Sequence, residues 1–378
     1  MSDVPEIDLT DPAVHRDPFA VYGAAREHGP VAKLVGPGFG PLWVLTRLAD
    51  ARAMLTDPRF ALGPGSYQAL DVPEHCRAYL RTMQEMEGAE HRRLRGLVSP
   101  AFTARRAADF RPRIEPIVGE LLDGLPAEGA DLLTGFAQPL PMEVICELVG
   151  VPEADRPRWH SYGQNVVAGS GESFAAAVPG IIDGARGLTT PPASEFLELL
   201  AGTEGLTEPE LVTLVWQLVL AGQTPANFVA NAVEALLTHP DQLAVLRAEP
   251  GLWPTAIEEL MRWCGPQLLT IPRQATEDLS LHGVAIRAGE PVSAAIASAN
   301  RDPRVFTDPD RLDVRRTEGG HVGFAYGPHF CLGAALARVE AEVALRGLLE
   351  RFPALRLGDV RRAPDPGTWR LAGLPVSF

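Results

Sequence analysis

The chain has 378 residues, 46% of them apolar and 22% charged, which is ordinary for a globular protein. Its formal net charge of −14 argues against a nucleic-acid partner and against an anionic membrane surface. The four cysteines include no close pair, so no disulfide framework or zinc motif is visible. The N-terminus has neither a basic segment nor a long apolar run, and we expect a cytoplasmic protein without a membrane anchor.

The first part of the chain alternates between short helical and extended patterns. Helices are predicted over Asp17–His28 and Ala49–Leu55. Between them, Val31–Arg47 alternates around a Gly- and Pro-rich turn and predicts a small hairpin. No clear period is found over Ala61–His75, where Gly and Pro are frequent, so we predict a loop.

A helix is predicted over Glu90–Val98, and it carries two basic residues on one face. His91 and Arg95 are four positions apart and share that face, whereas Arg92 and Arg93 point elsewhere. A histidine and an arginine placed in this way form a clamp for two carboxylates, because Arg offers a bidentate fork. A basic helix face is also typical of a solvated surface, so the pair alone is a weak signal.

The middle of the chain is predicted to be helical. Apolar periodicity predicts short helices over Ile114–Leu122, Met142–Leu148, Asp155–Val167 and Phe174–Leu188. The longest apolar helical pattern then runs over Glu208–Leu237. Pro225 lies inside it and has no N–H, so the carbonyl of Ala221 should lose its partner and the helix should kink.

The last third mixes one amphipathic helix with short extended segments. The helix is predicted over Ala256–Trp263 and contains Glu259 and Arg262, an i, i+3 pair. The run L-S-L-H-G-V-A-I predicts a hairpin with a Gly turn, and Pro291–Ala297 predicts a further extended segment. The final run, L-A-G-L-P-V-S-F, predicts another pair of short strands.

One cysteine stands in a setting that suits metal chemistry. Cys331 lies in the loop F-A-Y-G-P-H-F-C-L-G, which runs from Phe324 to Gly333 and precedes a predicted helix over Ala334–Glu340. The positive end of that helix and the turn N–H groups favour a thiolate. Gly327 and Gly333 remove side chains where a flat macrocycle could lie against the backbone. The loop therefore predicts an axial thiolate ligand for a haem iron.

The spacing F-x-x-G-x-x-x-C-x-G resembles the haem-binding signature of the cytochromes P450. The E-x-x-R, H-x-x-x-R and N-R-D-P elements occur in the family's order, so the resemblance covers nearly the whole chain. It implies a mainly α fold with small β-sheets, formed by a single large haem-enclosing domain over residues 1–378. A length of 378 residues would otherwise favour two domains.

The resemblance also implies the activity, which is that of a soluble bacterial-type monooxygenase containing haem b, iron protoporphyrin IX. Such an enzyme oxidises a small organic molecule with O2 and with electrons from a separate ferredoxin or flavodoxin-like partner. Secondary metabolism is the expected setting, by analogy with the family alone. Basic residues near the thiolate could receive an acidic donor, although a solvated charge run is the simpler account; they are Arg92, Arg105, Arg106 and Arg338.

The resemblance assigns roles to residues around the haem. The cofactor-binding residues that it implies are Cys331 as the iron ligand, His91, Arg95, Arg273 and His329 beside the propionates, Phe324 and Gly333 in the loop, and Ala221 on the distal helix. Glu259 and Arg262 are similar to the family's buried ion pair, for which Arg311 is the candidate third member.

The distal helix departs from the family pattern A-G-x-acid-Thr. Its segment L-A-G-Q-T-P-A-N-F is one residue short between Gly222 and Asn227 and has no carboxylate. Aligned on Asn227, Thr224 takes the alcohol position and Gln223 replaces the acid. Aligned on Gly222, Thr224 takes the acid position and Pro225 replaces the alcohol, as in peroxide-using members. We favour the first alignment, which makes Thr224 and Gln223 the predicted catalytic residues and leaves proton delivery to water or substrate.

Two other functions stay open at this point. The missing acid is compatible with a peroxide-using or oxidative cross-linking member of the family. It is also compatible with a haem-binding recruitment module that has lost oxygen chemistry, although the intact thiolate loop argues against that. The middle of the chain looks short by family standards, which suggests a more open pocket.

Overall fold

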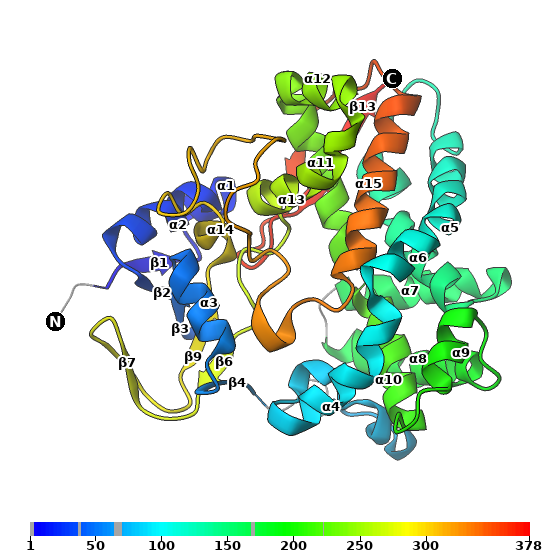
Figure 1. Cartoon of the computed structure of the whole chain (residues 1–378), viewed down its shortest axis with the longest axis horizontal. Helices are drawn as coiled ribbons and strands as arrows, with labels where there is room; N and C mark the ends of the chain where they lie inside the picture. The colour runs from blue at the N-terminus through cyan, green and yellow to red at the C-terminus, as the bar shows by residue number, and fades with distance from the viewer. Residues whose placement is uncertain (1–3, 37–38, 64–69, 168–170, 222) are drawn as a thin grey trace. The chain divides into compact units, whose positions relative to one another are not determined.

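The computed structural model describes residues 4–36, 39–63, 70–167, 171–221 and 223–378 (Figure 1). Its internal contacts divide the chain into two compact units, each built from three segments. The first unit comprises Met1–Gly63, Ala230–Cys331 and Val360–Ala372, and the second comprises Pro64–Val229, Leu332–Asp359 and Gly373–Phe378. The expectation of one domain over residues 1–378 therefore stays a prediction.

The first unit is organised on a six-stranded mixed sheet. In spatial order its strands are β1 (Glu6–Asp8), β2 (Val31–Gly36), β3 (Phe39–Leu45), β9 (Pro291–Ala294), β6 (Arg273–Ala275) and β4 (Phe60–Leu62). β2 and β3 pair antiparallel, which confirms the hairpin predicted over Val31–Arg47. β3 and β9 pair parallel although they are far apart in sequence, with Trp43 opposite Val292.

At β3, in the middle of this sheet, both faces are buried. Val44 and Leu45 are consecutive in β3 and belong to different hydrophobic clusters, because successive side chains of a strand point to opposite faces. The helices of the unit are α1 (Pro12–Arg16), α2 (Pro18–His28), α3 (Leu48–Thr56), α12 (Pro240–Ala248), α13 (Trp253–Cys264) and the short α14 (Ile296–Ala299). α2, α3 and α13 confirm the helices predicted there.

One extended segment of the C-terminal third differs from the prediction. The segment Pro291–Ala297 is extended only as far as Ala294, after which Ile296–Ala299 forms a helical turn that packs on α2 and α3. The hairpin of β7 (Leu279–Leu281) and β8 (Val284–Ile286) is confirmed. The two short strands predicted in the tail are confirmed: β12 (Leu371–Gly373) pairs with β11 (Arg361–Arg362), and β13 (Pro375–Ser377) pairs with β10 (Arg356–Leu357) and β5 (Ala130–Asp131).

The second unit is mainly helical. Its helices are α4 (Gly88–Val98), α5 (Ala104–Asp123), α6 (Pro139–Val149), α7 (Arg156–Val167), α8 (Gly171–Thr189), α9 (Glu195–Ala201), α10 (Glu208–Ala221) and α15 (Ala334–Arg351). α5 and α15 lie side by side (Figure 1). A core cluster joins α6, α8 and α10, and in it Trp216 donates its indole N–H to the carbonyl of Tyr79 at 2.8 Å.

The predicted long helix over Glu208–Leu237 is described as α10 and α11 (Gln223–Thr238). Gly222, between them, lies outside the described residues, so the kink expected there stays a prediction. Pro225 is the third residue of α11, in the first turn, where a missing N–H is tolerated. None of the helices in the described part of the chain has the length and apolar character that crossing a bilayer requires.

Candidate functional site

The cysteine loop is held by backbone hydrogen bonds of the first unit. The N–H of Cys331 donates to the carbonyl of Phe324 at 2.9 Å, and the N–H of Phe330 donates to the carbonyl of Gly327 at 3.0 Å. Gly327–His329 forms a short 3-10 turn between them. The loop thus closes on itself, and Cys331 is placed three residues before α15 begins.

Two glycines of the loop differ in their backbone conformation and in their surroundings. Gly327 has a φ of 74°, and a Cβ there would lie 2.7 Å from Thr56 Cγ2 and 3.0 Å from the Leu55 carbonyl oxygen. Both its backbone conformation and its surroundings therefore require glycine. A Cβ on Gly333, the N-cap of α15, would meet no described atom within 4 Å. Gly333 thus leaves free space beside its backbone, which a flat ligand could occupy.

Of the four cysteines, only Cys331 is exposed. Burial raises the pKa of the Cys146 and Cys264 thiols to about 12 and also raises the pKa of Cys76. Those three thiols therefore stay protonated near neutral pH and have no access to a ligand. Cys331, exposed ahead of a helix N-terminus and followed by an open glycine, fits the thiolate ligand of a haem iron.

The predicted propionate clamp lies on α4 of the second unit. His91 is buried and Arg95 is half-buried, whereas Arg92 and Arg93 are exposed, as the helical spacing predicted. Arg93 forms an ion pair with Glu210. The role of His91 and Arg95 toward a propionate stays a prediction.

Two further predicted propionate residues lie in the first unit. Arg273, on β6, is buried, and its guanidinium donates to the carbonyl of Leu55 at 3.0 Å and of Phe60 at 3.4 Å. His329 is half-buried at the end of the 3-10 turn. Phe324, the first residue of the loop, is buried, with its ring centroid 6.3 Å from that of Phe330. These positions leave the propionate roles as predictions.

The buried ion pair of α13 is confirmed, but its predicted third member is wrong. Arg262 donates to both carboxylate oxygens of Glu259, at 2.6 and 2.8 Å. The second arginine on Glu259 is Arg316, whose Nε lies 3.2 Å from Oε1, and all three side chains are almost completely buried. Arg311 contributes only its backbone carbonyl, which accepts from Arg262 at 3.2 Å. Arginines are frequent in this segment, and their spacing alone does not tell which one turns inward.

The distal residues are described only in part. Ala221 and Thr224 are exposed, at the end of α10 and the start of α11. Gln223 is helical, and its side chain lies outside what the structure describes. The assignment of Thr224 and Gln223 to catalysis therefore stays a prediction.

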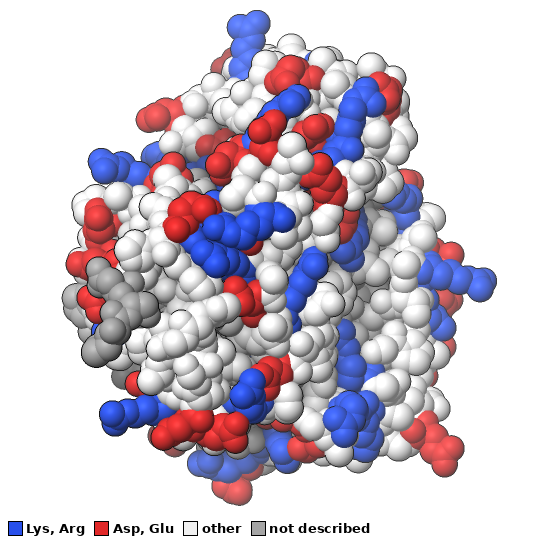
Figure 2. All heavy atoms as spheres, turned by 60° about the vertical axis from the view of Figure 1, so that its left-hand side comes forward, with Lys and Arg blue, Asp and Glu red and all other residues white. Residues whose placement is uncertain are grey.

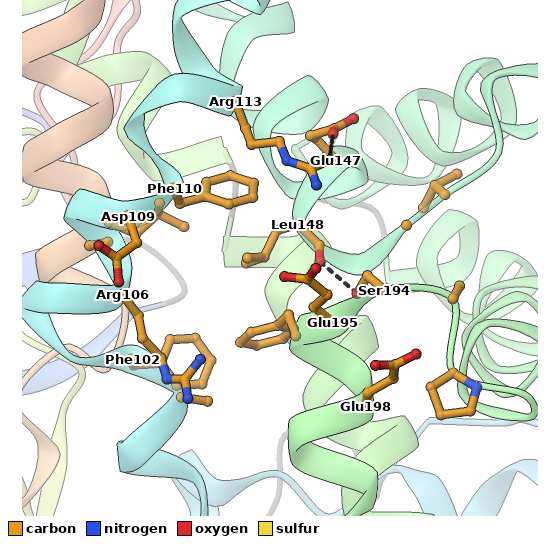
Figure 3. Close-up of a pocket in the computed structure, with 18 of the residues that line it drawn as sticks. Phe102, Arg106, Asp109, Phe110, Arg113, Glu147, Leu148, Ser194, Glu195 and Glu198 are labelled. Carbon is orange, nitrogen blue, oxygen red and sulfur yellow. Dashed lines mark hydrogen bonds and ion pairs between the residues drawn. The ribbon is translucent and has the colours of Figure 1, made fainter.

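A cavity of about 670 Å³ lies within the second unit, where α5 faces α9 and the C-terminal end of α6 (Figure 3). Its walls include Phe102, Phe110, Glu147 and Glu195. None of the residues predicted to bind haem lines it. No sequence motif pointed to this cavity, because its walls come from segments that are far apart in the chain.

A mainly helical fold that presents one exposed cysteine ahead of a helix, with a buried Glu–Arg–Arg cluster, defines a haem-thiolate protein. The family model of the cytochromes P450 matches residues 252–372. The chain is 41% identical to mycinamicin IV hydroxylase/epoxidase of Micromonospora griseorubida, over 89% of this chain and 88% of that protein. It is 37% identical to 6-deoxyerythronolide B hydroxylase of Saccharopolyspora erythraea, over 95% and 94% of the two chains.

Solved structures agree with these relatives. The cytochrome P450 PksS of the Bacillus subtilis 168 bacillaene polyketide synthase superposes with a TM-score of 0.88 at 33% identity, covering 96% of this chain and 97% of that one. The chain therefore belongs to the cytochrome P450 family. It is a monooxygenase with the mainly α fold predicted from its sequence, and the cofactor of its family is protoporphyrin IX haem.

Proposed function

We propose that this monooxygenase hydroxylates or otherwise oxidises a C–H bond of a small molecule of secondary metabolism. The observation that carries the proposal is the exposed thiol of Cys331 in its closed loop ahead of α15. Relatives support the substrate class: one is named for 6-deoxyerythronolide B hydroxylation and another for polyketide biosynthesis. Polyketides are therefore the first class of substrate to test.

The proposed cofactor-binding residues are those that the family resemblance implies. Cys331 ligates the iron, and Gly333 allows the macrocycle to approach the backbone. His91, Arg95, Arg273 and His329 hold the propionates, for which His and Arg supply charge-assisted hydrogen bonds. When bound, the haem supplies the oxidation chemistry, and the chain supplies binding, orientation and access for protons.

Proton delivery is proposed to depend on water. The hydroxyl of Thr224 is exposed and can both donate to and accept from a water molecule. Gln223 can orient a water through its amide but cannot release a proton as a carboxylic acid does. The carbonyl of Ala221, for which Pro225 has no N–H, is available to accept from the same water.

The electrons are proposed to come from a separate ferredoxin or flavodoxin-like protein. On the face that Figure 2 shows, acidic and basic side chains are interspersed, and neither kind forms an extended patch. Arg92, exposed on α4, is a candidate contact for an acidic donor. A reducing cytoplasm suits this role, because it keeps Cys331 from forming a disulfide.

The missing distal acid favours a second candidate function, oxidation driven by hydrogen peroxide. Turnover of the purified, haem-loaded protein separates the two candidates. Ligands that shift the haem absorption band are first selected from a panel of polyketides. Each is then incubated either with NAD(P)H, ferredoxin and reductase under ¹⁸O₂, or with hydrogen peroxide alone.

Incorporation of ¹⁸O that requires the electron donor supports the monooxygenase proposal. Product formed with peroxide alone, at an equal or higher rate, supports the second candidate. Failure to oxidise any ligand that shifts the band would support a binding module instead. The Cys331→Ser variant is the control, because it should lose the red-shifted Soret band of the reduced, carbon-monoxide-treated protein.

A further inference from the structure

The cavity of the second unit has an aromatic wall. Phe102, Phe110 and Phe196 line it together with Leu148. The rings of Phe102 and Phe196 meet edge to face, with centroids 5.3 Å apart and planes at 83°. At about 670 Å³ the cavity is within the range that holds small organic ligands. It can therefore take up an apolar ring or chain.

Two of the three arginines in the lining are already neutralised. Arg113 binds Glu147 at 2.8 Å, and Arg156 binds Glu147 at 3.0 Å and Glu143 at 2.7 Å. Although burial alone would raise it, the hydrogen bonds from these arginines lower the pKa of the Glu147 carboxyl. The positive charges of Arg113 and Arg156 are balanced by carboxylates of the same network. Neither arginine therefore attracts an anionic ligand strongly.

Two carboxylates of the lining are available. The carboxylates of Glu195 and Glu198, on α9, form no ion pair or hydrogen bond among the described residues. The start of α9 is anchored, because the hydroxyl of Ser194 donates to the carbonyl of Leu148 at 2.8 Å and accepts from the N–H of Leu197 at 3.3 Å. Figure 3 shows the Glu195 side chain reaching into the space between α9 and α5, on the side where Phe110 lies.

The remaining arginine limits how a ligand can be oriented. Arg106 lies beside Phe102 on the α5 side, and its Nε donates to the carbonyl of Pro100 at 3.1 Å (Figure 3). A positive group placed near Arg106 would be repelled, whereas one placed near Glu195 would be attracted. A cationic ligand is therefore oriented with its charge toward α9.

We propose that this cavity binds an organic ammonium ion with an aromatic or aliphatic body, with Glu195 as its counter-ion. The ammonium group pairs with the carboxylate, and the body covers the phenylalanine rings, whose faces attract cations and apolar groups alike. The site is additional to the haem-dependent activity, since no residue predicted to bind haem or to move protons lines it.

The probe is dansylcadaverine, a fluorescent naphthalene attached to a primary ammonium group, titrated calorimetrically into the haem-loaded protein. An imidazole that ligates the haem iron is present at saturation, which blocks binding beside the haem. We expect Glu195→Gln to weaken binding about three- to fivefold, as loss of one partly exposed charge pair would. Phe110→Leu, which keeps apolar bulk and removes the ring, should weaken it about two- to fivefold.

Glu153→Gln is the matched control, because Glu153 is exposed in the same unit and does not line the cavity. It should bind the probe as the unmodified protein does. Haem content and thermal melting establish that every variant is folded. Unchanged affinity in Glu195→Gln, equal affinity for the carboxylate analogue dansylglycine, or complete loss of binding with the imidazole present would each overturn the proposal.

Discussion

The Nε of Arg316 donates to Oε1 of Glu259 at 3.2 Å, and the two side chains are only 6% and 1% exposed. Because Arg262 binds the same carboxylate, Glu259 carries two buried positive partners. Removing one member of a buried charged cluster typically costs about 3–5 kcal/mol. We expect Arg316→Ala to lower the free energy of unfolding by that amount, measured by urea denaturation, and Glu259→Ala to lose haem and fold together.

Arg311→Ala is the control for this prediction. Its side chain is exposed, and only its backbone carbonyl takes part in the cluster. The free energy of unfolding should therefore change by no more than about 0.5 kcal/mol. Equal destabilisation by Arg311→Ala and Arg316→Ala would contradict the assignment.

Substitution of the two loop glycines by alanine should affect stability and haem content differently. Gly327→Ala places a Cβ against Leu55 and Thr56 at a φ of 74°, so we expect about 1–3 kcal/mol of destabilisation. Gly333→Ala meets nothing within 4 Å, so the haem-free protein should keep its thermal stability. Its methyl group would take up space that the proposed haem site needs, and we expect a lower ratio of haem to protein. Full haem content in Gly333→Ala would refute this geometry.

A buried carboxyl on α15 should make stability depend on pH. Glu340 is 3% exposed, its Oε1 has no hydrogen-bond partner among the described residues, and burial raises its pKa from 4.5 to about 8. Between these values the folded state holds a proton that the unfolded chain releases, so stability falls as the pH rises from about 4.5 to about 8. The full loss is on the order of 5 kcal/mol, an upper limit for a group that can relax.

Glu340→Gln keeps the shape and removes the titration. We expect this variant to be more stable than the unmodified protein at pH 8. Its free energy of unfolding should also decrease less between pH 5 and 8, and the difference between the two decreases should be on the order of the loss above. Glu350→Gln, on the same helix with 70% of its side chain exposed, should leave the pH profile unchanged. Parallel profiles for Glu340→Gln and the unmodified protein would show that Glu340 does not titrate in this range.

The helical face of α4 predicts which arginine holds the cofactor. Arg95 shares its face with the buried His91, whereas Arg92 is exposed. Arg95→Gln should release haem to apomyoglobin about ten- to a hundredfold faster, as loss of one charge-assisted hydrogen bond of about 1.5–3 kcal/mol would. Arg92→Gln should release it at the unmodified rate. A faster release from Arg92→Gln alone would reverse the assignment of the two residues.

Thr224→Ala tests the proposed proton path. Without the hydroxyl, water is held less well, and we expect less product per NAD(P)H consumed and more hydrogen peroxide released. Thr238→Ala, at the other end of α11, removes a hydroxyl that bonds only within the helix and nearby residues, and it is the control. If Thr224→Ala and Gln223→Ala both leave rate and coupling unchanged, neither residue belongs to the path.

Local signals were sufficient for much of the site. The cysteine loop, the helix after it and the faces of α4 follow from spacing and turn residues within about ten positions. The burial of Glu340 also has a sequence signal, since Leu336, Val343 and Ala344 lie at i−4, i+3 and i+4 and form an apolar face around it. Such patterns are readable because helix geometry relates neighbours in sequence to neighbours in space.

Other features depended on how distant segments meet. The extended run ending at Ala297 becomes helical after Ala294 because that turn packs on α2 and α3, and short-range periodicity carries no information about those helices. The inward turn of Arg316 likewise depends on a carboxylate 57 positions away.

The sequence by itself therefore determined the family and most helices and predicted the iron ligand, because each is encoded in residues close together in the chain. The partner of Glu259, the pairing of the tail strands and the cavity beside Glu195 were decided only by the tertiary structure. Their physical reason is the same: burial and charge pairing act between groups that are near in space, and only the folded chain brings α5, α6 and α9 together.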